Sequence, residues 1–358
     1  MKKILVVCAA ITLSCFLVRA QEAEDTGSGA GLSIISRLDG GLSYYQDEGL
    51  QFNFGNTSLY TLFEGNISEN WSFTVSNHWI ASDWTSAGFK DGILVPTADL
   101  AASTLNYPLS GYAGNSFFDE AHINFTTGNW EFAAGKLPLL VGGFEFDEWD
   151  YDVNPITTST FWNSFTVYQY GLTAAWTTPD EAHTFTAQIA TNQHNNSPAF
   201  GIRWNGELFG FWSTNYSVLM SKYAKPWAPI DAYIPIISIG NRFTFNDFTL
   251  TADFINRAGD PNYNYTDIDG LTVLATLGYK FSDALDVSAR YCREWFDQQI
   301  IDDNGNEVNY MKDIHPNISL QANWFPIENL RIQGCAGIRR DIIYVMAGAT
   351  YTFDFKLW

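Results

Sequence analysis

The sequence predicts an all-β fold: a transmembrane antiparallel up-and-down β-barrel of about 16 strands, with an inward-folded third loop. Three observations predict it. Segments of about ten residues alternate apolar and polar side chains, tight polar turns alternate with longer loops, and the N-terminus has the pattern of an export signal. No run of about 18 apolar residues follows that signal, so any passage through a membrane has to be made by strands.

The composition suits strands with one apolar and one wet face. Aromatic residues make up 16% of the 358 residues, and charged residues also make up 16%, below the roughly 25% of soluble domains. Ser, Thr, Asn, Gln and Gly supply the remaining polarity, which keeps the mean hydropathy at -0.11. The net charge of -20 argues against nucleic acid as a partner, because phosphate binding needs a basic face.

The first 20 residues predict a signal peptide. Lys2 and Lys3 precede a short apolar run at 4–18, and Ala20 is a small residue before a plausible cleavage point. A lipoprotein attached through Cys15 is the weaker alternative, since Thr12 departs from the usual lipobox pattern. We expect residues 1–20 to be the signal peptide, 21–31 a short disordered lead, and 32–358 the barrel.

Seven short polar turns give the strand count. Fourteen strands joined by these turns, together with one at 36–45 and a last one at 342–357, make sixteen, and an even number returns both ends to the same side. Aromatic residues gather beside the short turns, as in the girdle of a membrane barrel. The turns are expected at 68–70, 127–129, 178–182, 205–207, 246–247, 282–284 and 326–329.

The last expected strand, 342–357, has the clearest alternation. Eight apolar residues from Ile343 to Leu357 occupy every second position, which a helix stripe cannot produce. The chain then ends on aromatic residues, Phe353, Phe355 and Trp358, although Trp358 is one position out of phase with the apolar face.

Two cysteines remain after removal of the signal peptide. Cys292 and Cys335 are expected on strands separated by one other strand, about 10 Å apart, so we predict two reduced thiols instead of a disulfide. No Cys-His cluster has zinc-binding spacing, and we expect neither a metal nor another cofactor.

The loop between the fifth and sixth expected strands, residues 141–163, is the candidate for narrowing a barrel that is too wide to be filled by side chains. Two glycines at 142–143 permit a sharp turn away from the rim. A calcium-binding surface loop is the main alternative, although the order of the acids does not match an EF-hand. Five carboxylates lie within eight residues of this loop: Glu145, Asp147, Glu148, Asp150 and Asp152.

Basic residues share the polar phase of the expected strands. If the acidic loop folds inward, its carboxylates face this basic arc, and opposed charges at close quarters set ion selectivity in a pore. Each single residue could equally be a solvated wall residue or half of an ion pair with Asp39, Asp253, Asp286 or Glu294. The basic arc consists of Arg37, Arg203, Arg242, Arg257, Lys280, Arg290, Arg331 and Arg339.

Together these features resemble Gram-negative outer-membrane porins. Ala-Gly-Lys-Leu-Pro at 134–138 and Val-Gly-Gly-Phe-Glu at 141–145 look most like the porin O/P superfamily, including its Bacteroidota-type members. The resemblance covers the whole mature chain by architecture but only residues 135–152 by motif. The excess of 39 acidic over 19 basic residues and the acidic loop depart from the phosphate-selective members, so phosphate selectivity is not carried over.

The resemblance implies a location, partners and a role. It implies the bacterial outer membrane, contact with its lipid and lipopolysaccharide, recognition of the C-terminal strand by the barrel-assembly machinery, and a homotrimer. It also implies a water-filled channel for passive diffusion of small hydrophilic solutes, general or weakly cation-preferring.

Two alternatives to a channel remain from the sequence. One is an outer-membrane lipid or peptide hydrolase, but no segment commits to a Ser-His or Asp-His constellation, so no catalytic residue is assigned. The other is an adhesin or structural barrel with a plugged lumen.

Overall fold

The fold was determined from a computed structural model. It describes residues 29–45, 49–53, 57–82, 87–90, 93–96, 119–141, 143–147, 157, 159, 168–192, 195–222, 224–225, 228–229, 233–257, 269–301, 307–339 and 342–357. The expected signal peptide and most of the expected lead lie outside these residues. Within the described part of the chain, no helix has both the length and the apolar character needed to cross a membrane.

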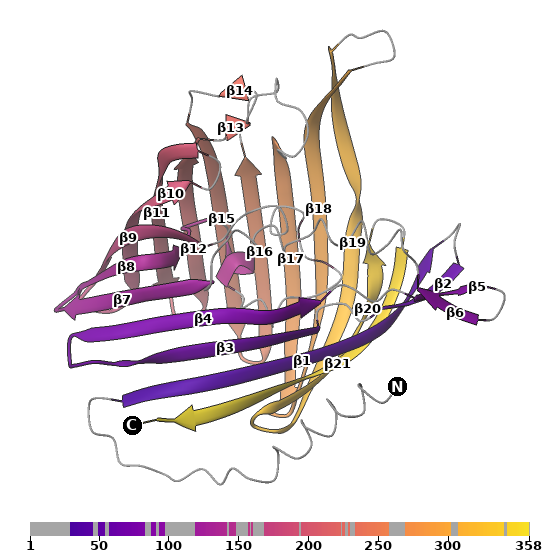
Figure 1. The fold of residues 1–358 in the computed structure, drawn as a ribbon, viewed down its shortest axis with the longest axis horizontal. Coiled ribbons are helices and arrows are strands. Elements are labelled where there is room, and N and C mark those ends of the chain that lie inside the picture. Colours follow the sequence, from indigo (N-terminus) through magenta and orange to yellow (C-terminus); the bar gives the residue numbers. More distant parts are fainter. Residues whose placement is uncertain are drawn as a thin grey trace.

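Sixteen strands form a closed antiparallel barrel, which confirms the predicted fold class (Figure 1). Each wall strand pairs with the wall strands that come before and after it in the chain. β21 pairs with β1 over residues 343–356, which closes the barrel. The wall strands are β1 (Gly29–Tyr45), β3 (Thr57–Asn66), β4 (Trp71–Ser82), β7 (Glu120–Thr127), β8 (Trp130–Pro138), β9 (Tyr168–Thr177), β10 (His183–Asn192), β11 (Asn195–Leu208), β12 (Trp212–Ser221), β15 (Ile234–Phe245), β16 (Phe248–Arg257), β17 (Asp269–Ser282), β18 (Leu285–Ile301), β19 (Glu307–Ile327), β20 (Leu330–Arg339) and β21 (Ile342–Lys356).

Short elements outside the wall belong to the longer loops. β2 pairs with the C-terminal end of β1, β5 pairs with β2 and β6, and β13 and β14 form a separate two-stranded ribbon. A single turn of 3-10 helix, η1, lies inside the barrel against β15 and β16 (Figure 1). These elements are β2 (Gly49–Asn53), β5 (Ala87–Lys90), β6 (Ile93–Pro96), β13 (Ala224–Lys225), β14 (Ala228–Pro229) and η1 (Phe144–Asp147).

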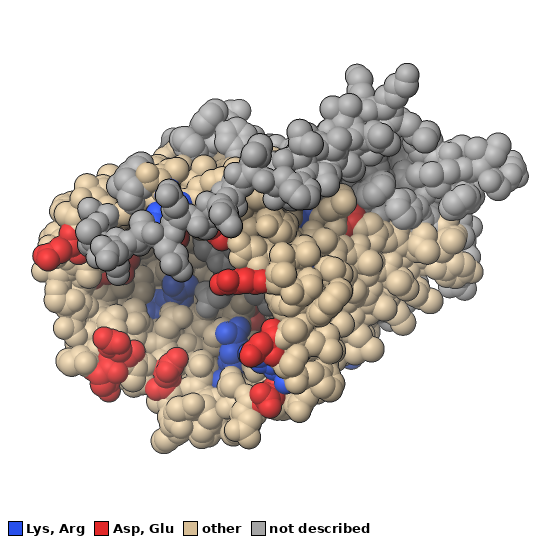
Figure 2. Space-filling view, turned by 90° about the horizontal axis from the view of Figure 1, so that it is seen from below, with Lys and Arg blue, Asp and Glu red and all other residues tan. Residues whose placement is uncertain are grey.

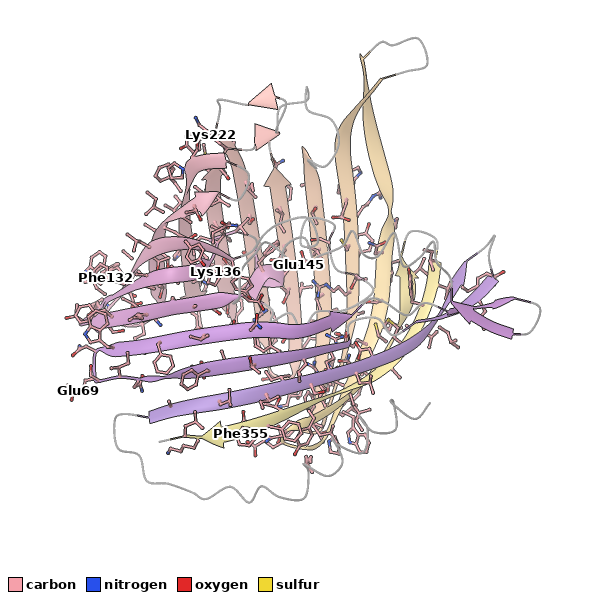
Figure 3. The ribbon with its side chains drawn as sticks, viewed as in Figure 1. Glu69, Phe132, Lys136, Glu145, Lys222 and Phe355 are labelled. Carbon is pink, nitrogen blue, oxygen red and sulfur yellow. The ribbon has the colours of Figure 1, made fainter. Side chains whose placement is uncertain are left out.

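The side chains alternate between the two faces of the wall, as the sequence predicts. On β1, Leu38 is 57% exposed on the outer face, whereas Arg37 is 1% exposed on the inner face. On β21, Ile343 and Val345 are exposed outside, and Met346 is buried inside. Apolar side chains such as Phe132 therefore form the outer surface (Figure 3), where lipid accommodates them.

Aromatic pairs line the outer face near the short turns. Trp71 on β4 packs against Phe125 on β7, and Phe185 on β10 stacks on Trp204 of β11. Aromatic rings, and above all the amphipathic indoles of Trp71 and Trp204, suit the boundary between hydrocarbon and headgroups.

One predicted turn is wrong. Residues 205–207 lie within β11, which continues to Leu208, and the turn that follows is Phe209-Gly210-Phe211. Phe209 and Gly210 have φ of 57° and 70°, the left-handed geometry of a tight hairpin. The Asn-Gly pair at 205–206 has turn-forming chemistry, but its cross-strand pairing with Asn215 and Thr214 keeps it in the sheet.

The last strand lies close to its predicted position, whereas the first strand begins seven residues before the predicted start at residue 36. β21 spans Ile342–Lys356 against the predicted 342–357. β1 begins at Gly29, so the last three residues of the expected lead at 21–31 belong to the first strand. Cys292 on β18 and Cys335 on β20 are buried thiols that are not joined in a disulfide, and β19 lies between their strands, as predicted.

Candidate functional site

The third long loop follows β8, and its described residues at 139–147 lie in the lumen on an apolar part of the inner wall. Leu139 and Val141 of the loop pack into a buried cluster, and Phe146 lies against it. Each fully buried aliphatic side chain contributes about 1.5–3 kcal/mol, so the cluster fixes the loop to the wall. The wall side of the cluster consists of Ala190, Ala199, Leu219, Ile236, Ile255, Leu274 and Cys292, from strands β10 to β18.

Polar contacts hold the entry of the loop. The side chain of Gln188 on β10 accepts a hydrogen bond from the Leu140 amide at 3.0 Å and donates one to the Pro138 carbonyl at 2.8 Å. Further along, Asn215 on β12 donates its amide N–H to the Gly143 carbonyl at 3.3 Å. The loop backbone therefore exchanges hydrogen bonds with the wall instead of with water.

Asp253 on β16 anchors η1. Its two carboxylate oxygens accept the amide N–H groups of Phe144 and Glu145, each at 2.9 Å. The loop approaches the wall closely here, because a Cβ on Gly143 would lie 2.2 Å from Asp253 Oδ1. Glycine at this position is therefore what permits the contact.

Glu145 is the central polar contact between the loop and the wall (Figure 3). It is 1% exposed, and its Oε1 lies 3.3 Å from Nη2 of Arg290 on β18. Its two oxygens also accept the amide and the hydroxyl of Ser159, at 2.8 and 2.6 Å. The carboxylate thus ties two points of the loop to one strand of the wall and is enclosed by its donors.

The other acidic residues of the loop have no described side chains. Asp147 ends η1, but its side chain lies outside the described residues, as do Glu148, Asp150 and Asp152. The structure therefore locates one of the five predicted loop carboxylates, Glu145, and places it at the wall and not at an open surface.

The described residues of the basic arc make different kinds of contact: buried ion pairs, a part-buried hydrogen bond, a stacking contact with an aromatic ring, and an exposed ion pair at the rim. Arg37 pairs with Asp39 at 2.7 Å, and Arg331 donates to the hydroxyl of Thr350 at 3.2 Å. Lys280 pairs with Asp283 at 2.7 Å near the short turn that follows β17. The side chains of Arg257 and Arg339, at the ends of β16 and β20, lie outside the described residues.

Two further arginines of the arc lie on the inner phase of their strands. Arg203 is half-buried on β11, opposite Ser217 of β12. Arg242 on β15 places its guanidinium 4.1 Å from the centre of the Phe144 ring, so the loop contributes an aromatic face to a wall cation. Arg242 and Arg290 therefore contact the loop, whereas Arg37 and Arg331 contact the wall.

Exposed carboxylates surround the end of the barrel that carries the short turns. Figure 2 shows a hollow with Lys and Arg inside it and Asp and Glu gathered at its edge. Two exposed lysines, Lys280 and Lys356, lie at the same end. The exposed carboxylates on or beside the short turns are Glu69, Glu131, Asp180, Glu181, Glu207, Asp247, Asp283 and Glu328.

Two of these rim carboxylates are held in the charged form. A hydrogen bond from the Thr178 hydroxyl, with a second from the Ala182 amide, lowers the pKa of Asp180. The hydrogen bond and positive charge of Lys280 lower the pKa of Asp283. Both groups therefore remain ionised at neutral pH and contribute negative potential at the rim.

The main residues that the sequence analysis missed are the wall anchors of the loop. Asp253 was considered only as an ion-pair partner for a wall arginine, and neither Gln188 and Asn215 of the wall nor Ser159 of the loop was identified. The sequence did contain a signal for the apolar cluster of the wall against which the loop packs. Leu219 and Ile236 are apolar residues in the inner phase, where polar residues are expected. Inner-phase apolar residues indicate a part of the wall that is covered.

The structure is similar to solved outer-membrane proteins. A Salmonella typhi OmpF complex with daunomycin aligns with a TM-score of 0.58 at 13% identity, over 91% of this chain and 97% of that one. An anion-selective porin from Comamonas acidovorans aligns with a TM-score of 0.55 at 9% identity, over 90% and 100%. The trimer form of OmpT from Vibrio cholerae aligns with a TM-score of 0.54 at 11% identity, over 91% and 100%.

Sequence comparisons add no closer relative. No protein-family model matches the chain. No curated protein matches it. At identities of 9–13% the structural likeness concerns the fold, so the chain has the barrel architecture of these outer-membrane proteins.

Proposed function

We propose that the chain is an outer-membrane porin, a water-filled channel through which small hydrophilic solutes diffuse passively. The observation that carries this proposal is the third loop, which is anchored by Asp253 and Glu145 to the inside of a closed barrel. A loop attached to one wall narrows a wide lumen at a fixed place. The inner phase elsewhere is polar, with half-buried residues such as Thr276 and Asn323, which suits contact with water.

The proposed ion preference is weak and for cations. Its support is the ring of exposed carboxylates at the rim, because rings of like charge concentrate counter-ions at a pore mouth. We retain Asp147, Glu148, Asp150 and Asp152 of the loop as candidates for a second acidic region. Glu145 has a different proposed role, since it is enclosed at the wall.

The remaining proposals concern the setting of the channel. We infer export by a signal peptide cleaved near Ala20, assembly through the C-terminal strand, contact with lipopolysaccharide, and membership of the porin O/P superfamily from the motif at 135–152. A homotrimer is supported by the trimer form of the similar Vibrio cholerae protein.

Reconstitution tests the channel and its preference separately. Proteoliposomes containing the protein should swell in isotonic glucose, and an absence of swelling would overturn the channel. In planar bilayers under a KCl gradient, the reversal potential should indicate cation preference. The combined variant Glu131→Gln, Asp247→Asn and Glu328→Gln should move that potential toward zero.

A second variant set assigns the preference to a region. Asp147→Asn, Glu148→Gln, Asp150→Asn and Asp152→Asn remove the loop carboxylates while leaving the rim intact. A shift only with the rim variant identifies the rim as the source, and a shift only with the loop variant identifies the loop. An unchanged reversal potential in both would overturn the proposed acidic origin of the preference.

A further inference from the structure

A cavity of about 390 Å³ lies beneath η1, on the side of the loop that faces the short turns. Its volume falls in the range of roughly 300–1,000 Å³ that small-molecule sites occupy. Phe144 and Glu145 of the loop form one side of the cavity, and β15 to β18 form the other. The wall contributes two arginines, Arg242 and Arg290, and threonine hydroxyls from three strands.

Arg242 is held in place but retains open donors. Its Nε donates to Thr251 Oγ1 at 3.2 Å, and its guanidinium stacks over the Phe144 ring at 4.1 Å. Neither of its terminal amino groups has a hydrogen-bond partner within the described part of the chain. A planar guanidinium fixed in this way presents a fork that matches a carboxylate and loses little freedom on binding it.

The two carboxylates of the cavity already have donors. Asp253 accepts the amide N–H groups of Phe144 and Glu145, and Glu145 accepts Ser159 and Arg290. They therefore offer little capacity to bind a cation. The cavity combines satisfied acceptors with an unsatisfied cationic donor.

Hydroxyl groups complete the lining. Thr244, Thr249 and Thr276 line the cavity, and their hydroxyls make no hydrogen bond to any described residue. A hydroxyl both donates and accepts, so it suits the hydroxyl groups of a solute. A carboxylate and several hydroxyl groups on one small molecule would match both kinds of lining group.

We propose that this cavity is a binding subsite for a small hydroxylated carboxylate, of the sugar-acid class. Arg242 binds the carboxylate, and the threonine hydroxyls bind the hydroxyl groups. The inference rests on the proposed channel function, which brings the solute into the lumen. The acidic rim slows the entry of an anion, whereas the subsite lengthens its stay, so the two regions act on different rates.

Current fluctuations in a planar bilayer test the subsite, with glucuronate as the probe and glucose and inorganic phosphate as comparisons. Glucuronate added on the short-turn side should interrupt the current transiently, and it should bind at least about tenfold more strongly than glucose. Arg242→Gln should weaken glucuronate binding by about tenfold or more, the effect of losing a charge-assisted hydrogen bond. Lys280→Gln is the matched control, because it removes one positive charge at the rim, outside the cavity, and should leave the binding constant unchanged.

A second variant separates binding from loop position. Thr276→Val removes one hydroxyl with little change in shape, and the Thr276 hydroxyl makes no hydrogen bond to the described part of the loop. It should weaken glucuronate binding several-fold while leaving acetate binding unchanged. Equal weakening of both anions would contradict the assigned role of the hydroxyls.

Titration calorimetry on the detergent-solubilised protein measures the same affinities without conduction. A barrel that binds glucuronate but passes no current would overturn the proposed channel and leave the subsite intact. A conducting barrel that does not bind glucuronate would overturn the subsite alone. Phosphate binding as strong as glucuronate binding would replace the sugar-acid assignment with a general oxyanion site.

Discussion

Two ion pairs of the barrel differ in distance and in setting. Glu145 and Arg290 approach to 3.3 Å between the loop and the wall, with side chains 0% and 5% exposed. Lys280 and Asp283 approach to 2.7 Å at the rim, with side chains 55% and 101% exposed. The rim pair is shorter, but water and salt screen it, whereas the loop pair has exchanged water for its partners.

The comparison shows that burial, and not distance, decides what each pair does. Removing one partner from a buried pair leaves a charge without compensation, and that loss exceeds the net value of the intact pair. Removing one partner from an exposed pair returns the other to water. The loop pair therefore fixes the position of a segment, and the rim pair adjusts local charge.

The largest expected effect comes from Glu145→Gln. The amide can still accept from Ser159, but it cannot balance the buried charge of Arg290, a loss of about 3–5 kcal/mol when one partner of a buried pair is removed. We expect the amides of Phe144 and Glu145 to exchange hydrogen with solvent about a hundredfold faster or more, and the channel conductance to become larger and noisier.

The matched control for this change is Asp283→Asn at the rim. It alters the same kind of side chain and the same charge, and the exchange of η1 should remain at the wild-type rate. Unchanged exchange in the Glu145→Gln protein would show that the pair does not hold the loop.

An intermediate effect is expected from Gly240→Ala on β15. A Cβ at this position would lie 2.6 Å from Asp253 Oδ1 and 3.1 Å from Gly143 Cα. Asp253 must then move away from the amides it accepts, and a buried amide without its partner costs about 1–3 kcal/mol. We expect roughly tenfold faster exchange of the Phe144 and Glu145 amides, measured by mass spectrometry.

Gly334→Ala on β20 provides the control for this substitution. A Cβ there meets nothing within 4 Å, so the change in intrinsic preference is similar but no loop contact is disturbed. Equal exchange rates at η1 in the two alanine variants would show that the close approach at Gly240 does not affect how the loop is held.

The sequence predicted the fold better than the site, for a physical reason. The alternation of apolar and polar residues is local and repeats along each strand, so β21 was predicted to within one residue of its observed end. The contact of Asp253 with Glu145 joins residues 108 positions apart and depends on the register of several intervening strands. No local pattern contains that register.

The wrongly predicted turn and the apolar wall cluster that was not predicted have different causes. Asn205-Gly206 has the chemistry of a turn, yet the pairing of β11 with β12 keeps it extended, and the turn falls at Phe209-Gly210. The apolar wall cluster could have been predicted, because Leu219 on β12 and Ile236 on the adjacent strand β15 are paired and both lie in the inner phase. Apolar residues there predict that something covers them, although not that the cover is the third loop.

The smallest expected effect concerns the rim pair and separates charge from stability. Lys280 lowers the pKa of Asp283 from its ordinary value of 3.8. A depressed carboxyl pKa contributes stability above the unfolded-state pKa, and that contribution is lost as the pH falls through the folded-state pKa, here below about 3.8. Lys280→Gln should return the pKa of Asp283 toward its ordinary value, as followed by carbon-13 NMR of the carboxyl group. The thermal midpoint at neutral pH should change only slightly, because water and salt screen this exposed pair and leave its contribution to stability small. A large fall in that midpoint would mean that exposure does not weaken the pair, and the contrast with Glu145 and Arg290 would fail.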